Sequence, residues 1–290
     1  MKIAGFTIIR NAVVNDYPVV EAIRSILPVV DEMIVSIGDS EDDTENLIRS
    51  IHSDKIKIVH SVWDMSLRRG GAVLAVETNK AMQHIAPDAD WAFYIQGDEV
   101  VHEKYHIAIR EAALKYKDDK KIDGLLFKYL HFYGTFDYIG DSRRWYNHEV
   151  RVIRNDKGIT AYLDAQGFRR NGKKLLVKPI DAYVYHYGWV KSPKKMFEKQ
   201  KHVSRFWNET EPGRETLQKE ELFDFNNQYD SLEKFTDTHP AVMRERIGMQ
   251  NWNVALDTGK KYFSLKGRIL YWIEKRTGKR LFDFRNYKIT

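Results

Sequence analysis

Short apolar segments rich in β-branched residues alternate with helical periodicities through the first part of the chain, and this alternation constrains the fold most strongly. The expected strands are residues 3–9, 32–37, 55–62 and 91–95, and the expected helices between them are residues 18–27, 44–51 and 72–85. Strands that are separated by helices usually pair in parallel through right-handed crossovers. The sequence therefore predicts an α/β fold with a mostly parallel central sheet flanked by helices.

Polar loops follow three of these strands. They are RNAVVND at residues 10–16, GDSEDD at 38–43 and QGDE at 96–99. The carboxyl ends of parallel strands meet at one edge of a sheet, and ligands bind along that edge. We therefore expect these loops to converge on a single site.

The pattern changes after Asp123. Residues 124–134 and 149–155 read as strands of a mixed or antiparallel continuation, and residues 162–177 and 182–190 extend it. From Ser192 onward the pattern is mostly helical and polar. We expect one α/β domain over residues 1–190 and a helical, basic extension over residues 191–290.

The positive charge of the chain is concentrated near its end. Residues 260–288 hold ten Lys and Arg against two acidic residues, a local charge of +8, so the remainder carries −2 of the total of +6. This distribution favours a local contact over a broad nucleic-acid-binding face, and we expect no nucleic-acid partner. The segment is expected either to contact an anionic membrane surface or to dock on the body with its charges solvated.

The chain has no cysteine, which excludes disulfides and thiolate metal sites. It also has no run of roughly 18 apolar residues, the length that a membrane-spanning helix needs. The expected location is therefore cytoplasmic, either soluble or peripheral on the inner face of a membrane.

Residues 91–106, WAFYIQGDEVVHEKYH, contain two incompatible metal motifs. His102, Glu103 and His106 match the H-E-x-x-H signature of zinc peptidases, but Ile109 occupies the glycine position of its extended form. Asp98 and Glu99 follow an apolar strand, and their carboxylates suit Mg²⁺ or Mn²⁺. The second interpretation is favoured because three strand-end loops converge there.

The run FTIIRNAVVNDYPVVEAIRSILPVVDEMIVSIGDSEDDTENLIRSI, with ETNKAM and WAFYIQGDEVVHE after it, resembles family-2-type glycosyltransferases of the GT-A fold. The resemblance covers residues 3–106 well and 123–199 more loosely. It implies a Rossmann-like GT-A domain, with residues 1–122 as the nucleotide-sugar half and 123–190 as the acceptor half. It also implies inverting transfer from a nucleoside-diphosphate sugar to a glycan or lipid-linked acceptor, with Mg²⁺ or Mn²⁺, in bacterial surface polysaccharide synthesis.

The chain departs from the family pattern at two positions. Gln96 replaces the first Asp of the D-x-D metal motif, and Ile37 replaces the Asp that closes the second strand. The resemblance then implies a metal held mainly by Asp98, with Glu99 adjacent. It also implies that His186 completes the shell or contacts the diphosphate; packing in the core among tyrosines is the alternative for this residue. The residues expected to bind the donor nucleotide are Arg10, Asn11, Asp39, Asp42, Gln96 and Gly97.

The remaining site residues are expected beyond the metal motif. Asp164 is the first candidate for the general base that deprotonates the acceptor, with Glu149 and Asp141 behind it. The cations expected at the diphosphate are Arg143, Arg144 and Lys195, with Lys194 and Lys199 as further candidates. The aromatic side chains expected under the acceptor sugar are Trp145, Tyr146 and Trp189; core packing is the alternative for each.

Three other functions remain open. A zinc peptidase would use His102, Glu103 and His106. A non-catalytic nucleotide-sugar or glycan binder is compatible with the departures at Gln96 and Ile37. A nucleotidyltransferase would need a glycine-rich phosphate loop after the first strand, and RNAVVND contains no glycine.

Overall fold

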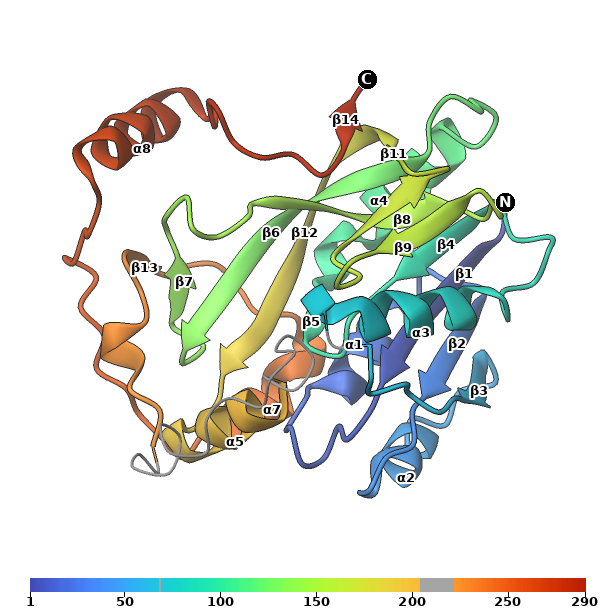
Figure 1. The fold of residues 1–290 in the computed structure, drawn as a ribbon, viewed down its shortest axis with the longest axis horizontal. Helices are drawn as coiled ribbons and strands as arrows, with labels where there is room; N and C mark the ends of the chain where they lie inside the picture. Colours follow the sequence, from blue (N-terminus) through green and yellow to red (C-terminus); the bar gives the residue numbers. More distant parts are fainter. Residues whose placement is uncertain (68, 204–221) are drawn as a thin grey trace.

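The computed structural model describes residues 1–67, 69–203 and 222–290, and its centre is an 11-stranded mixed sheet (Figure 1). The first strands lie in the order β3-β2-β1-β4 and all run parallel. Their bounds are β1 (Ile3–Ile9), β2 (Glu32–Ile37), β3 (Ile56–His60) and β4 (Trp91–Tyr94). Each strand lies within one residue or two of the range expected from the sequence.

The second half continues the same sheet with mixed directions. Strand β8 (His148–Arg154) pairs antiparallel with both β4 and β6 (Gly124–Gly134). Strand β12 (Leu176–Val190) runs parallel to β6 and antiparallel to β5 (Glu99–Val101). The predicted fold class, a mixed and mostly parallel central sheet flanked by helices, is confirmed.

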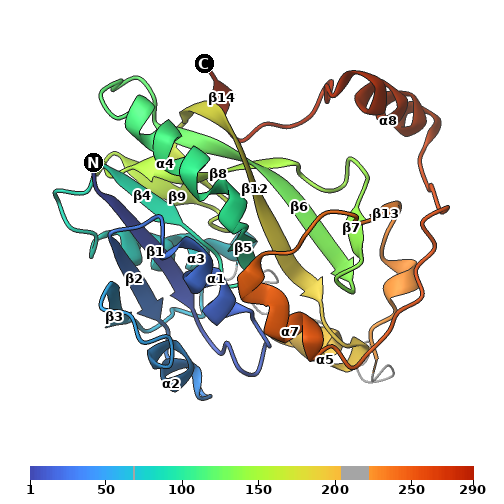
Figure 2. The ribbon, with the colours of Figure 1, turned by 180° about the vertical axis from the view of Figure 1, so that it is seen from behind.

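Helices cover both faces of this sheet. One face carries α1 (Val19–Ile26) and α4 (His106–Lys115), as Figure 2 shows. The other face carries α3 (Ala72–Met82) and a small antiparallel sheet of β9 (Ile159–Tyr162), β10 (Gly167–Arg170) and β11 (Lys173–Lys174). The sequence pattern did not separate this small sheet from β12. The shorter elements are α2 (Thr44–Arg49), η1 (Arg69–Gly71) and η2 (Glu103–Tyr105).

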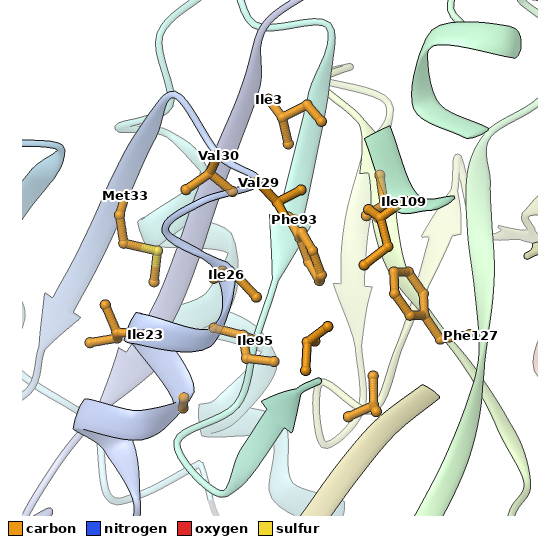
Figure 3. Packing of buried hydrophobic residues seen from close by; sticks show 14 of the residues in the cluster. Ile3, Ile23, Ile26, Val29, Val30, Met33, Phe93, Ile95, Ile109 and Phe127 are labelled. Atoms are coloured by element: carbon orange, nitrogen blue, oxygen red, sulfur yellow. The ribbon is translucent and has the colours of Figure 1, made fainter. Parts of the chain in front are cut away.

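The core under α1 shows why the sequence adopts this arrangement. Helix α1 buries Val19, Ala22, Ile23 and Ile26, residues that helical spacing places on one face. They pack with Phe93 of β4 and other apolar side chains (Figure 3). Complete burial of a large aliphatic or aromatic side chain contributes about 1.5–3 kcal/mol. This packing fixes the parallel strands, and with them the loops at their carboxyl ends.

The described C-terminal residues wrap around the body. Helix α5 (Pro193–Val203) follows β12, and strands β13 and β14 add to the edge strand β7 and to β12. The bounds of these later elements are β7 (Tyr138–Gly140), η4 (Phe225–Asn227), β13 (Leu232–Lys234), η5 (Ala241–Met243), α7 (Arg244–Gly248), α8 (Leu265–Thr277) and β14 (Lys288–Ile289). The expected extension therefore contains strands as well as helices.

Helix α8 lies at the periphery, on the side of the molecule opposite β3 (Figures 1 and 2). Among the helices that the structure describes, none combines the length and the apolar character needed to cross a membrane.

Candidate functional site

The loops after β1 and β2 are joined by hydrogen bonds between backbone and side chains. The amide of Ala12 donates to Thr44 Oγ1 at 2.7 Å, and the amide of Val14 donates to Asp42 Oδ2 at 2.8 Å. Asn11 donates from its amide to Ser40 and accepts from the amide of Glu41. The expected nucleotide-binding residues Asn11 and Asp42 therefore shape this edge by holding the two loops together.

A cavity of about 200 Å³ lies beside these loops, at the carboxyl ends of β1 and β4. Its polar lining consists of Arg10, Asn15, Gln96, Gly97, Asp98, Asp164 and Lys199. Its apolar lining consists of Ile8, Ile9, Tyr17, Trp63, Leu74 and Tyr94. A concave site that combines an apolar wall with convergent polar groups is typical of small-molecule binding. Asp39 lies just behind the lining, where it accepts from the guanidinium of Arg10 at 3.1 Å.

Asp98 is the negative centre of the cavity. Its Oδ2 lies 3.2 Å from Lys199 Nζ and 3.7 Å from His186 Nε2. Burial alone would raise the pKa of this carboxyl, but the charges of Lys199 and His186 outweigh it and lower the pKa to about 2. Gly188 permits this approach, because a Cβ there would lie only 2.6 Å from the same oxygen.

Two lysines bring positive charge to this carboxylate. Lys199 Nζ also donates to the carbonyl of Gly188 at 2.9 Å and lies 4.9 Å from the centre of the Tyr17 ring. Lys191 is buried, and its ammonium donates to the carbonyl of Asp16. Burial, and then the neighbouring charge of Lys199, lower the pKa of Lys191 to about 7. The cavity therefore brings cationic side chains next to one carboxylate.

The residues around Asp98 do not fit the expected divalent ion. Mg²⁺ and Mn²⁺ prefer several oxygen ligands, whereas Asp98 offers one carboxylate that is already paired with an ammonium group. The other expected ligand, His186, has its Nδ1 3.3 Å from Nδ1 of His131. Within residues 1–67, 69–203 and 222–290, no group of three or more His, Asp or Glu side chains is arranged to hold a metal.

Glu99 faces the core, away from the cavity. Its carboxylate oxygens accept from Arg151 Nε at 2.8 Å and Nη2 at 2.7 Å, and from the hydroxyl of Tyr129. The amide of Gln96 donates to it as well, at 3.1 Å. Both Glu99 and Arg151 are fully buried. The prediction that Glu99 binds metal is therefore corrected: its oxygens are used by this ion pair.

The three candidate bases occupy different environments. Asp164 lines the cavity, and burial raises the pKa of its carboxyl. Glu149 is also buried, which raises its pKa to about 7, but it is not among the lining residues. Asp141 is held by the ammonium groups of Lys261 and Lys275, far along the chain. Of the three candidates, only Asp164 has both a carboxyl with a raised pKa and a place in the lining of the cavity.

The cations expected at the diphosphate bind other parts of the chain. Arg143 donates to Glu274 at 3.1 Å, and Arg144 donates to the carbonyl of Gln228 at 2.7 Å. Lys195 pairs with Glu198 on its own helix at 3.1 Å. None of these three is a lining residue, so this part of the prediction is corrected in favour of Lys199.

The aromatic residues expected under the acceptor pack together around His131. The ring centre of Tyr146 lies 4.3 Å from that of His131, and the ring centre of Trp145 lies 5.3 Å from it. Trp189 lies edge-on to Trp145 at 6.2 Å. These rings form a cluster beside His186 and do not line the cavity. Core packing, the alternative considered for each, describes them better.

The zinc-peptidase motif does not form a helical metal site. His102 is extended and caps the short helix η2, whereas His106 begins α4, so the two are not on one helical face. His102 Nε2 lies 2.9 Å from Thr238 Oγ1, and His106 Nε2 lies 2.8 Å from the carbonyl of Ser25. Glu103 accepts from the amide of Ala241. The match to H-E-x-x-H is incidental.

Sequence reasoning did not single out several residues of this site, among them Tyr17, Trp63 and Lys191. Trp63 directly follows the third expected strand, so the same rule that selected the other strand-end loops applies to it. The signal for Lys191 is weaker. It directly follows an aromatic strand, as the other strand-end residues do, but lysine is a residue type that is usually exposed, so its burial is not expected from the sequence.

No protein-family model matches the chain, and no curated protein matches it in sequence. Among solved structures it is similar to TarS of S. aureus, with 14% identity over 70% of this chain and 39% of that chain and a TM-score of 0.41. Residues 1–349 of TarS, in complex with UDP, match with 13% identity over 70% of this chain and 64% of that one, at a TM-score of 0.39.

A further match is glucosyl-3-phosphoglycerate synthase from Mycobacterium tuberculosis, in complex with Mn²⁺, UDP and phosphoglyceric acid. It is 19% identical over 45% of this chain and 43% of that chain, with a TM-score of 0.30. The chain thus spans less than two thirds of the length of these neighbours. All these TM-scores are below 0.5, so the matches support no statement about this chain beyond the fold already described from its own strands and helices.

Proposed function

We propose that this chain is a glycosyltransferase that transfers a sugar from a nucleoside-diphosphate donor to a hydroxyl of a glycan or lipid-linked acceptor. The observation that supports the proposal most strongly is the cavity at the carboxyl ends of β1 and β4, which Asp98, Asp164 and Lys199 line. Ligands of open α/β sheets bind at this edge. The wider context, bacterial surface polysaccharide synthesis, rests on the sequence resemblance alone.

The lining divides into parts that suit such a donor. Trp63, Leu74 and Tyr94 offer an apolar wall for the nucleobase, and Arg10 lies next to it. The diphosphate would lie toward Lys199, whose ammonium can exchange the carboxylate of Asp98 for phosphate oxygens. Lys191 supplies a second positive charge behind it when it is protonated.

The proposed reaction is a direct displacement at the anomeric carbon. Asp164 accepts the proton of the acceptor hydroxyl as the new carbon–oxygen bond forms, and the bond from the anomeric carbon to the diphosphate oxygen breaks. The negative charge that develops on the leaving diphosphate is stabilised by Lys199. Inversion at the anomeric carbon follows from a single displacement. The resemblance implies Mg²⁺ or Mn²⁺, but the residues around Asp98 do not fit such an ion, and no step here depends on it.

A non-catalytic nucleotide-sugar binder is the second candidate. It is favoured by one observation: the carboxylate of Asp98 is already neutralised by Lys199, and Gln96 offers no second carboxylate. Such a protein would bind the donor in the same cavity but would not release nucleoside diphosphate.

The first test is a thermal-shift panel of UDP-, GDP-, CMP- and dTDP-sugars with the full chain. One of the nucleoside-diphosphate classes (UDP, GDP or dTDP) should raise the melting temperature, since a ligand at 100 times its Kd stabilises the folded state by about 2.7 kcal/mol. Lys199→Ala should strongly reduce the shift. Lys195→Ala, one turn earlier on α5 and paired with Glu198, should retain it. If no donor shifts the melting temperature, the proposal is wrong; binding without diphosphate release favours the binder.

A further inference from the structure

Helix α8 uses one face to contact the body of the protein. Tyr271 donates its hydroxyl to Asp141 Oδ2 at 2.5 Å, and Glu274 accepts from Arg143 at 3.1 Å. Lys275 pairs with Glu233 at 3.1 Å. Polar contacts of this kind set which side of the helix faces the protein and leave the opposite side to solvent.

The opposite side carries an apolar stripe. Leu265, Ile269 and Trp272 are 77%, 54% and 58% exposed. Their spacing of four and three residues places them on one face of the helix. Ser264 caps the start of α8, and Gly278 ends it in a left-handed conformation, so both ends of the helix are defined by its own sequence. The stripe is therefore a formed surface that nothing in the described chain covers.

Cationic side chains flank this stripe. Unlike Lys275 on the inner face, which pairs with Glu233, they include side chains without an acidic partner among the described residues. Lys266 and Arg268 are exposed, and neither side chain makes an ion pair with any residue that the structure describes. The Arg276 guanidinium lies 4.9 Å from the centre of the Trp272 ring. Two large apolar side chains follow the helix, Phe282 and Phe284, which are 89% and 79% exposed.

We propose that the outer face of α8 binds an anionic membrane surface, with the helix lying in the plane of the interface. An exposed apolar face flanked by Lys and Arg is the pattern of interfacial helices, whose cations meet anionic headgroups while their apolar side chains enter the acyl boundary. A second copy of the chain fits less well. A two-fold contact would place the same face of each copy together and bring like charges into contact.

The proposal is independent of the sugar donor, because α8 and the cavity share no residue. It gives a physical reason for a lipid-linked acceptor, which would be held at the same surface as the enzyme. Failure of one proposal leaves the other standing: vesicle binding needs no donor, and the donor-induced thermal shift needs no membrane.

The test is co-sedimentation of the full chain with sucrose-loaded vesicles. We expect binding to vesicles of phosphatidylcholine with 30% phosphatidylglycerol, little binding to phosphatidylcholine alone, and weaker binding at high salt, on the order of tenfold or more, because salt screens exposed charges. The double variant Ile269→Ser, Trp272→Ser should reduce partitioning at least about tenfold, since the binding of an interfacial helix scales with the apolar area that it buries.

Two matched charge substitutions distinguish membrane binding through α8 from a general attraction of the basic protein to anionic vesicles. Lys266→Glu should weaken vesicle binding, whereas Lys120→Glu, also exposed but in the loop after α4, should leave it nearly unchanged. An unchanged melting temperature for each variant shows that the fold is intact. Equal loss in both charge variants would overturn the proposal, as would binding that survives the double substitution. A dimer in solution that dissociates on the double substitution would assign the face to a second copy instead.

Discussion

The edge of the sheet that forms the cavity and the C-terminal residues 222–290 are held in different ways. At the cavity, neighbouring strands carry loops whose backbone amides are bonded to side chains about thirty positions away, and the ion pair of Glu99 with Arg151 beneath them is fully buried. The C-terminal segment is held at intervals by ion pairs between residues far apart in the chain, such as Lys261 with Asp141 and Glu274 with Arg143, and α8 buries no residue. Substitutions at the cavity edge should therefore affect both stability and catalysis. Substitutions in residues 222–290 should weaken the contacts of that segment with the body without detaching it.

The largest expected effect is on chemistry at the cavity. Asp164→Asn removes the proposed base but keeps nearly the same shape, so diphosphate release should fall by roughly 10²- to 10⁴-fold while the donor-induced thermal shift persists. Both quantities are measured with the donor class that binds. Asp181→Asn changes an exposed carboxylate that pairs with Lys128, and it should leave the rate unchanged. A normal rate in Asp164→Asn would exclude Asp164 as the base.

The next effect is on folding beneath the cavity. Glu99→Ala leaves the buried guanidinium of Arg151 without its partner, and breaking a buried ion pair in this way costs about 3–5 kcal/mol. Urea unfolding measures the loss of stability. Glu103→Ala, four positions along and half exposed, should cost less than about 1 kcal/mol. Similar costs for the two variants would show that Glu99 does not anchor the core.

These two regions also differ in how far the sequence predicts them. The parallel strands, their helices and the loop convergence follow from local periodicity and the strand-end rule, and two of the residues singled out in this way, Asp98 and Asp164, line the cavity. The periodicity of residues 91–106 does not show that Asp98 and Glu99 point in different directions. The prediction that Glu99 binds metal is wrong for this reason, because its carboxylate faces Arg151 in the core. Pairs such as Arg143 with Glu274 have no local signature, because they depend on how the chain returns to the body. The sequence therefore predicts that Arg143 and Arg144 bind the diphosphate, because the residues that they contact in the structure lie far along the chain.

A third effect sharpens the role of charge in the cavity. The ammonium of Lys199 already pairs with the carboxylate of Asp98, so donor affinity should change less than about tenfold when Mn²⁺ is replaced by EDTA. Lys199→Ala should weaken the donor by about 1.5–3 kcal/mol, the value of a hydrogen bond to a charged group. Calorimetric titration of the donor measures both. Strict Mn²⁺ dependence that Asp98→Asn removes would restore the metal site predicted from the sequence.

The smallest expected effect tests how the C-terminal segment is attached. Burial would raise the pKa of Asp141, but Lys275, Tyr271 and Lys261 lower it below its ordinary value. A carboxyl with a lowered pKa stabilises the folded state above its unfolded pKa of about 4, and this contribution is lost as pH falls through the folded pKa. Asp141→Asn should therefore cost about 1.5 kcal/mol at neutral pH and progressively less in acid. Thermal unfolding measured from neutral to acidic pH gives both quantities. Because the cavity lies elsewhere, the variant should keep its donor-induced shift, and a loss of that shift would mean that the C-terminal segment and the cavity are coupled.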